Sequence, residues 1–260
     1  MEGKYAVITG SSQGLGKSFA YELAKNGWNL ILISLPDENL QHMSKRLNSL
    51  FGIRAFYYET DLTIKDNVMA VCNWINGNFD IQMLINNAGI GGTKRFDEVS
   101  SAYIEKIIQL NVLATTLLTH QLLPNLKRQE KSYVLNVSSL AAFSPIAYKT
   151  VYPASKAFIH SFSRGLYQEL KDTSVFVSVV NPGPMRTNPD TTKRINEQGI
   201  FANLTALDPD KLARYCIRQL MKRDTVIMVN PISWLLLKIL PVWIRLPLLS
   251  NKIKRELASR

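Results

Sequence analysis

The stretch that decides the fold is Thr9-Gly10-Ser11-Ser12-Gln13-Gly14-Leu15-Gly16, which begins at the end of the apolar run Tyr5–Thr9. In such a stretch Gly10 allows a tight turn, Gly14 lets the backbone approach a pyrophosphate, and Gly16 permits close packing of a helix on the sheet. The following helix offers unpaired N–H groups and a partial positive charge to phosphates. Three glycines also occur in purely structural turns, but their position between a strand and a helix predicts a dinucleotide-binding site.

Beyond this turn, short apolar runs alternate with longer amphipathic stretches. Continuous apolar runs such as Asn29–Ser34 are typical of strands covered on both faces. Strands are expected at 5–9, 29–34, 54–59, 83–86, 133–138, 175–181 and 225–229, and helices at 16–26, 37–50, 65–75, 101–126, 153–170 and 209–222. This alternation predicts an α/β fold, a Rossmann-type doubly wound parallel β-sheet of about seven strands with helices on both faces.

No Gly/Ser/Pro-rich linker divides the chain. We therefore expect a single catalytic domain over residues 1–230, followed by an apolar and basic C-terminal extension over residues 231–260. Asp208-Pro209 predicts the start of the last domain helix, because Asp208 can accept from free N–H groups and a proline loses nothing at the first helical position.

The composition narrows the class of protein. The 260 residues carry a formal net charge of +11, yet no nucleic-acid-binding motif accompanies it, so no nucleic-acid partner is expected. The two cysteines lie far apart without metal-ligand spacing, and the three histidines show no ligand pattern, so no disulfide scaffold and no metal site are predicted. The N-terminus does not resemble a signal peptide, which predicts a cytoplasmic protein.

Further motifs follow the glycine turn in a fixed order. Asp61-Leu62 follows the third strand, Asn86-Asn87-Ala88-Gly89 follows the fourth, and Asn111 lies within a long helix. The remaining motif residues are Ser139, Tyr152, Lys156, Pro182, Gly183 and Thr187. With these motifs the chain resembles the short-chain dehydrogenase/reductase family from about residue 4 to residue 187. The strings GKSFAYELAKNGWNLILIS and VYPASKAF are similar to its branch of very-long-chain 3-ketoacyl-CoA reductases and 17β-hydroxysteroid dehydrogenases, with 3-ketosphinganine reductases nearby.

Tyr152 and Lys156 are the candidates for proton transfer. Their spacing of four residues places both side chains on one helix face, and a nearby ammonium favours a phenolate, so we expect Lys156 to lower the pKa of Tyr152. The resemblance implies that Ser139, rather than Ser138, hydrogen-bonds the substrate oxygen, and that Asn111 holds a water linking Lys156 to solvent. The alternatives are an exposed Tyr152–Lys156 pair and an Asn111 that merely caps or kinks its helix.

The resemblance also implies a nicotinamide dinucleotide as cofactor. Asp61 would contact the adenine, the Asn87–Gly89 segment would border its ribose, and Thr187 would bond the nicotinamide amide. Asn86 is expected to tie strands together instead. The residues expected at the cofactor are Gly10, Ser12, Gln13, Gly14, Leu15, Gly16, Ser34, Asp61, Leu62, Asn87, Ala88, Gly89, Tyr152, Lys156, Pro182, Gly183 and Thr187.

The end of the second strand bears on the choice of cofactor. NAD-binding relatives usually place a carboxylate there for the ribose 2′-hydroxyl, whereas this chain has Ser34 followed by Leu35. Without a carboxylate a 2′-phosphate meets no repulsion, and the hydroxyls of Ser12 and Ser34 could donate to it. The sequence therefore favours NADP(H) over NAD(H), although neither Leu35 nor Gln13 supplies the basic side chain common in NADP-binding relatives.

The C-terminal extension over residues 231–260 combines apolar and basic residues. The run Ile232–Leu249 is interrupted by Lys238, Pro241, Arg245 and Pro247, so a membrane-spanning helix is not expected. The prolines predict two short helices, the second starting near Pro241. Trp234 and Trp243 favour a peripheral contact with the inner membrane surface; the alternative is packing over the substrate cleft or against another subunit.

Taken together, these features predict an oxidoreductase that interconverts a ketone and a secondary alcohol, and they favour the reduction of a hydrophobic or lipid-like 3-keto substrate. A broad-specificity reductase of small carbonyls remains the alternative within the same class. A nucleotide-sensing protein without turnover is the alternative from another class, but such proteins commonly lose the tyrosine or the lysine. Family resemblance implies a homodimer or homotetramer.

Overall fold

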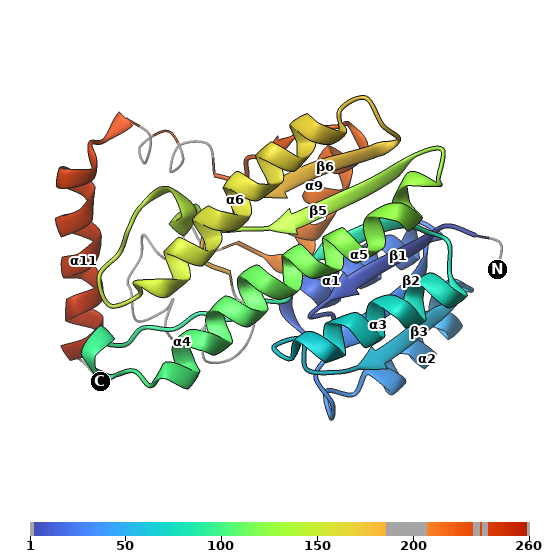
Figure 1. Cartoon of the computed structure of the whole chain (residues 1–260), viewed down its shortest axis with the longest axis horizontal. Helices are drawn as coiled ribbons and strands as arrows, with labels where there is room; N and C mark the ends of the chain where they lie inside the picture. Colours follow the sequence, from blue (N-terminus) through green and yellow to red (C-terminus); the bar gives the residue numbers. More distant parts are fainter. Residues whose placement is uncertain (1–2, 186–206, 231–234, 236–238, 259–260) are drawn as a thin grey trace.

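The computed structural model describes residues 3–185, 207–230, 235 and 239–258. Its centre is a parallel sheet with the strand order β3-β2-β1-β4-β5-β6-β7 (Figure 1). The strands are β1 (Tyr5–Thr9), β2 (Asn29–Ser34), β3 (Ala55–Glu59), β4 (Ile81–Asn86), β5 (Ser132–Val137), β6 (Val175–Val180) and β7 (Val226–Ile227). All seven predicted strands are therefore confirmed, with ends that differ from the prediction by at most two residues.

Helices cover both faces of this sheet, as predicted. Seven α-helices account for most of the covering chain: α1 (Gly14–Lys25), α2 (Leu40–Phe51), α3 (Lys65–Asn78), α4 (Ser101–Ile108), α5 (Thr115–Lys127), α6 (Val151–Leu170) and α9 (Pro209–Met221). One buried cluster joins the sheet to α1, α2 and α9, and a second joins it to α3, α5 and the end of α6. The burial of strands such as Val175–Val180 at every position follows from these two layers.

The ends of the helices follow local chemistry. Asp208 caps α9 by accepting from the N–H groups of Asp210 and Lys211 at 2.9 and 3.1 Å, which confirms the predicted start at Pro209. The predicted helix over 37–50 begins instead at Leu40. Asp37 and Asn39 have φ values of 64° and 57°, so the backbone turns in the left-handed region before the helix starts.

The long helix predicted over 101–126 contains an irregular segment. Between α4 and α5, residues Gln109–Ala114 form a π-helical turn around Asn111. Such turns interrupt the regular hydrogen-bond pattern and often accompany functional sites. Two short 3-10 helices, Phe96–Glu98 and Leu140–Phe143, lie in the loops after β4 and β5.

The extension contributes helix α11 (Val242–Ala258), which begins directly after Pro241, as expected. In Figure 1 it stands beside the loop that leads into α6, and the backbone N–H of Ala147 in that loop donates to the Ser250 hydroxyl at 3.2 Å. Among the residues that the structure describes, no helix is long and apolar enough to cross a membrane. Trp234 and Lys238 lie outside the described residues, and the division into residues 1–230 and 231–260 stays a prediction.

Candidate active site

The glycine turn after β1 has the geometry that a phosphate cradle requires. Gly10 and Gly14 have φ values of 63° and 53°, in the left-handed region that favours glycine. A Cβ atom on Gly16 would lie 2.0 Å from the carbonyl oxygen of Gly10, so no side chain fits between α1 and the turn. Because α1 begins at Gly14, its free N–H groups lie at the turn, and the residues present fit the phosphates of a dinucleotide.

The loop after β4 holds this turn in place. The side-chain amide of Asn87 donates to the carbonyl oxygens of Thr9 and Gly10 at 3.0 and 3.1 Å. The Thr9 hydroxyl oxygen accepts from the backbone N–H groups of Asn87 and Ala88, both at 3.0 Å. The Asn87 side chain thus supports the turn, a role that the sequence did not reveal. Whether this segment borders the adenine ribose stays a prediction.

The neighbouring Asn86 ties strands together, as expected. Its amide nitrogen donates to Asn136 Oδ1 on β5 at 2.8 Å and to the Thr119 hydroxyl on α5 at 2.9 Å. All three residues are buried, so these bonds are shielded from water.

Ser139, Tyr152 and Lys156 meet at the carboxyl end of β5. Ser139 follows that strand and precedes a 3-10 turn, and its side chain is near enough to Tyr152, in the first turn of α6, to affect the pKa of the phenol. Lys156, one helical turn later, places its Nζ atom 5.9 Å from the centre of the Tyr152 ring. Pro153 fits because it also lies in the first turn, where no intrahelical donor is needed. The exposed-pair alternative is wrong, because Lys156 is 5% exposed.

The two adjacent serines have different surroundings. The Ser138 hydroxyl is buried and donates to the backbone carbonyl of Lys156 at 2.7 Å, which anchors α6 to β5. Ser139 is the one whose side chain lies near Tyr152. Its expected hydrogen bond with the substrate oxygen stays a prediction.

Burial dominates the ionisation of this cluster. It lowers the pKa of Lys156 from 10.5 to about 8, although Nζ donates to the Val137 carbonyl at 2.9 Å. Burial also raises the pKa of Tyr152, and the hydrogen bond with Ser139 opposes this increase. The expected lowering of the tyrosine pKa by Lys156 is therefore wrong for the protein alone. The physical reason is that both groups are withdrawn from water, and burial disfavours the charged form of each.

Asn111 fastens the loop after β4 to the π-helical turn. Its amide nitrogen donates to the Ile90 carbonyl at 2.8 Å and to the Ser155 hydroxyl at 3.0 Å, and its oxygen accepts from the Ile90 N–H at 2.9 Å. A Cβ atom on Gly89 would lie 3.2 Å from both Asn111 Oδ1 and Lys156 Nζ, so Asn111 and Lys156 flank the same glycine. The water assigned to Asn111 by resemblance stays a prediction.

The end of β2 carries a carboxylate that the sequence analysis missed. The Ser34 hydroxyl lies 2.8 Å from Glu38 Oε2 and 2.9 Å from the Ser12 hydroxyl oxygen, and Ser12 also donates to Glu38 Oε2. The premise that no carboxylate lies beside these two serines is therefore wrong. Glu38 could not be predicted from the sequence, because it lies four residues after the end of the strand. Only a turn of the backbone brings its side chain close to Ser12 and Ser34.

The remaining predicted cofactor residues lie at the same sheet edge. Asp61 and Leu62 follow β3; Asp61 Oδ1 accepts from the N–H and hydroxyl of Thr63, and Leu62 is buried. Pro182, which with Gly183 follows β6, accepts from the Leu140 N–H at 2.9 Å. Their contacts with a dinucleotide stay predictions, and Thr187 lies outside the described residues. Gln13 is exposed before α1, whereas the Leu15 side chain is buried in the core, so only its backbone faces the turn.

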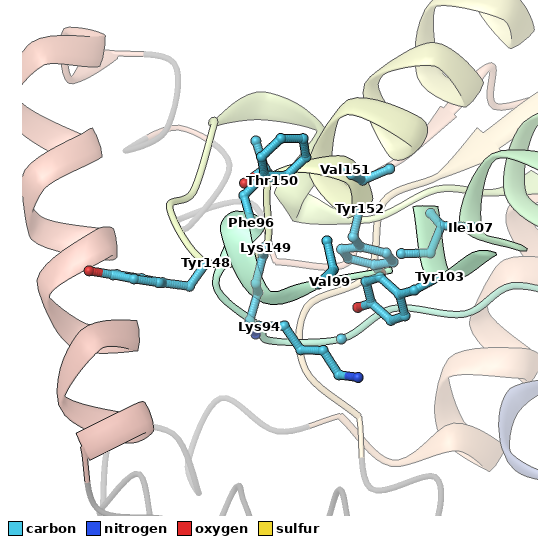
Figure 2. Close-up of a pocket in the computed structure, with 11 residues that line it drawn as sticks. Lys94, Phe96, Val99, Tyr103, Ile107, Tyr148, Lys149, Thr150, Val151 and Tyr152 are labelled. Carbon is cyan, nitrogen blue, oxygen red and sulfur yellow. The ribbon is translucent and has the colours of Figure 1, made fainter. Parts of the chain in front are cut away.

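A pocket opens beside Tyr152 (Figure 2). Figure 2 shows Tyr152 and Tyr103 at one end, while the Tyr148 ring points away toward α11. A Cβ atom on Gly91 would lie 2.9 Å from the Tyr152 ring, so the backbone of this glycine, which the sequence analysis did not single out, makes room for the phenol. The lining residues are Gly92, Lys94, Phe96, Val99, Tyr103, Ile107, Tyr148, Lys149, Thr150, Val151 and Tyr152. Across the described part of the chain, no group of His, Cys, Asp and Glu could hold a metal ion.

Comparison with known proteins agrees with this geometry. The family model described as short chain dehydrogenase matches residues 4–198. The chain belongs to the short-chain dehydrogenase family. This confirms the resemblance inferred from the motifs and agrees with the Rossmann-type sheet, and members of the family are oxidoreductases that use a nicotinamide cofactor.

Individual family members refine the comparison. A rat protein named very-long-chain 3-oxoacyl-CoA reductase is 34% identical over 69% of the chain, and the matched region spans 59% of the rat protein. A chicken protein named hydroxysteroid dehydrogenase-like protein 1 is 30% identical over 93% of the chain and 73% of its own length. The structure of a short-chain dehydrogenase from Sphingobium yanoikuyae in complex with NADPH has a TM-score of 0.79 and 27% identity, covering 90% of this chain and 92% of its own. The chain thus spans less than two thirds of the rat relative, and the expected similarity to the 3-ketoacyl-CoA reductase branch is confirmed.

Proposed function

We propose that this protein interconverts a ketone and a secondary alcohol, with Tyr152 as the group that transfers the proton. One observation carries the proposal: a phenol, a hydroxyl and a buried ammonium, from Tyr152, Ser139 and Lys156, converge beside a phosphate-binding turn. The three groups lie at the carboxyl edge of a doubly wound sheet, where ligands of such folds bind.

Each side chain has a defined task in the reduction of a ketone. When bound, the nicotinamide ring would exchange the hydride with the carbonyl carbon and, in its oxidised form, add a positive charge that favours phenolate. The Ser139 hydroxyl donates to the carbonyl oxygen and holds it beside the phenol. Tyr152 gives its proton to that oxygen as negative charge develops there. Lys156, as an ammonium, stabilises the phenolate that remains, and oxidation of the alcohol reverses these steps.

The decisive experiment replaces Tyr152 with phenylalanine, which keeps the ring that packs against Gly91 and removes only the hydroxyl. We expect kcat for ketone reduction to fall by about 10²–10⁴-fold, the usual contribution of positioned acid–base groups, while dinucleotide binding is retained. Tyr103→Phe is the matched control. Tyr103 lines the same pocket, but it has no part in the proton transfer proposed for Tyr152, Ser139 and Lys156. Full turnover by a folded Tyr152→Phe protein would refute the proposal. A wild-type protein that turns over no ketone would instead support the nucleotide-sensing alternative.

For the substrate we propose a hydrophobic or lipid-like ketone, such as a 3-keto compound. Phe96, Val99, Ile107 and Val151 give the pocket beside Tyr152 a largely apolar lining. The rat relative is named for the reduction of a 3-oxoacyl-CoA, which supports the same class. A panel running from small diketones to long 3-keto lipids, with nicotinamide absorbance as the readout, tests this choice. A kcat/KM that does not rise with apolar length would favour the small-carbonyl alternative.

The preference for NADP(H) favoured by the sequence stays a prediction. The Sphingobium relative binds NADPH, which supports it. The Glu38 carboxylate on Ser12 and Ser34 argues against it, because a second anion at these hydroxyls would be repelled.

A peripheral contact of the extension with a lipid surface is a second part of the proposal. Ile239, Trp243 and Leu248 are 67%, 72% and 62% exposed, and an exposed tryptophan favours a membrane–water interface. Flotation with anionic liposomes tests this contact. The wild-type protein is compared with a double variant that carries both Trp243→Ser and Leu248→Ser. Equal flotation of both would contradict the membrane contact. Packing against another subunit, as in the expected homodimer or homotetramer, would appear as a changed oligomeric state of the same variant.

A further inference from the structure

The pocket beside Tyr152 carries positive charge on an otherwise largely apolar lining. Lys94 and Lys149 both line it, and among the lining residues that the structure describes none is Asp or Glu. In the view of Figure 2, the Lys94 side chain lies below Tyr103, and Tyr103 lies below Tyr152. Because a purely apolar ketone makes no favourable contact with an ammonium, the charge points to another group on the substrate.

Two contacts hold Lys94 at this pocket. Its backbone N–H donates to the Tyr148 carbonyl at 2.8 Å, which joins the loop after β4 to the loop that leads into α6. Its Nζ atom lies 4.9 Å from the centre of the Tyr103 ring, within the range of a cation–π contact. The ring alone makes this contact, so the Tyr103 hydroxyl takes no part in it. A flexible lysine side chain is thereby held at one end of the pocket.

The Tyr103 ring is itself fixed by its surroundings. A Cβ atom on Gly92 would overlap the Tyr103 hydroxyl oxygen, so the end of the ring fills the space that a side chain would need. At the start of α4, the Ser100 hydroxyl accepts from the Tyr103 backbone N–H at 3.3 Å. The bare backbone of Gly92 and the capped helix thus set the position of the ring on which the Lys94 ammonium rests.

The carboxylates that follow Lys94 in the sequence are already paired. Arg95 forms ion pairs with Asp97 and Glu98, each at 3.0 Å, so the adjacent guanidinium holds both acids. In the described part of the chain Lys94 itself makes no ion pair. The charge of Arg95 is therefore balanced locally, whereas that of Lys94 is not. An ammonium without a counter-charge at the mouth of a pocket attracts anionic ligands.

We propose that Lys94 determines the substrate class by binding an anionic group that lies a few bonds from the ketone, as in a 3-oxo carboxylate. The apolar lining holds the chain of the substrate and the ammonium holds the anion. The short reach follows from the position of Lys94, which rests on Tyr103 at the same end of the pocket as Tyr152. The phosphates of a coenzyme A thioester lie many bonds from the ketone and would not reach this ammonium. The inference rests on the proposed function, because it takes the carbonyl to lie against Tyr152.

The test compares a 3-oxo fatty acid with its methyl ester, which keeps the ketone and the chain and removes the charge. For the wild-type protein, kcat/KM for the acid should exceed that for the ester at least about tenfold, the usual scale for one charge-assisted contact. Lys94→Met, which removes the ammonium and keeps a similar length, should lower this acid-to-ester ratio at least about tenfold, mainly through KM for the acid. Added salt should also lower the ratio of the wild-type protein, because salt screens exposed charges.

Lys106→Met is the matched control, because it removes the same charge from an exposed residue of α4 that does not line the pocket. It should leave the acid-to-ester ratio as in wild type, and an equal response to both variants would overturn the inference. A wild-type protein that reduces acid and ester equally well would also overturn it.

The coenzyme A thioester of the same 3-oxo acid is the third substrate. If Lys94→Met lowered kcat/KM for this thioester and not for the acid, the anion would belong to the distant phosphates, and the proposed short reach would be wrong. A wild-type protein that reduces none of the three compounds would instead overturn the proposed function.

Discussion

Replacing Lys156 with methionine should inactivate the protein and make it more stable at neutral pH. Burial lowers the pKa of Lys156 from 10.5 to about 8, so keeping this ammonium charged near pH 7 opposes folding. With about 1.4 kcal/mol for each pKa unit, the difference amounts to about 3 kcal/mol. Methionine leaves the Val137 carbonyl without the donor now 2.9 Å away, at a cost of about 1 kcal/mol. The expected net gain is therefore about 2 kcal/mol.

The sign of the pH dependence follows from the same pKa. Between about pH 8 and pH 10.5 the unfolded chain binds the Lys156 proton and the folded chain does not, so the stability of the wild-type protein rises with pH across this window. The advantage of Lys156→Met should be complete below about pH 8. Toward pH 10.5, where only the lost hydrogen bond with Val137 remains, the variant should be about 1 kcal/mol less stable than wild type. Methionine at this site is also close in length to the lysine stem, so packing against Gly89 changes little.

Urea unfolding of the protein without dinucleotide, at about pH 7 and about pH 10, measures both effects. In thermal unfolding at neutral pH, the midpoint temperature of Lys156→Met should be roughly 4–8 °C above that of the wild-type protein, for a chain of this size. Lys106→Met, on the exposed side of α4, is the control and should change stability little at either pH. A variant less stable than wild type near pH 7, or one with the same gain at both pH values, would refute the reasoning about the buried ammonium.

Three further predictions concern the same edge of the sheet. Ketone reduction should fall above about pH 8, where Lys156 loses its proton, and a profile of kcat/KM against pH that stays flat to pH 10 would contradict this. Gly16→Ala should weaken dinucleotide binding at least about tenfold, since its Cβ would lie 2.0 Å from the Gly10 carbonyl oxygen; titration by nicotinamide fluorescence measures it. Ser139→Ala should lower kcat by about 10²-fold with little loss of stability. Ser138→Ala should lower the free energy of unfolding by about 1 kcal/mol, because it removes a buried hydrogen bond. Steady-state kinetics and urea unfolding of both variants test this, and the reverse pattern would contradict it.

The sequence by itself determined the features that depend on local spacing. The glycines at 10, 14 and 16 and the alternation of apolar runs were enough to predict the parallel sheet, the phosphate turn and the helix carrying Tyr152 and Lys156. These predictions held because a tight turn needs left-handed glycines and a four-residue spacing is one helical turn, whatever the rest of the chain does. Asp208 capped α9 for the same local reason.

Only the tertiary structure decided how the environment changes these groups. Lys156 and Tyr152 form the expected pair, but the depth at which the sheet and α6 bury them sets their pKa values, and no spacing encodes that depth. Likewise Glu38 stands four residues past the strand in sequence, and two left-handed residues bring its carboxylate onto the serines. Charge, burial and backbone reversal act between residues distant along the chain, so their balance exists only once the layers have packed.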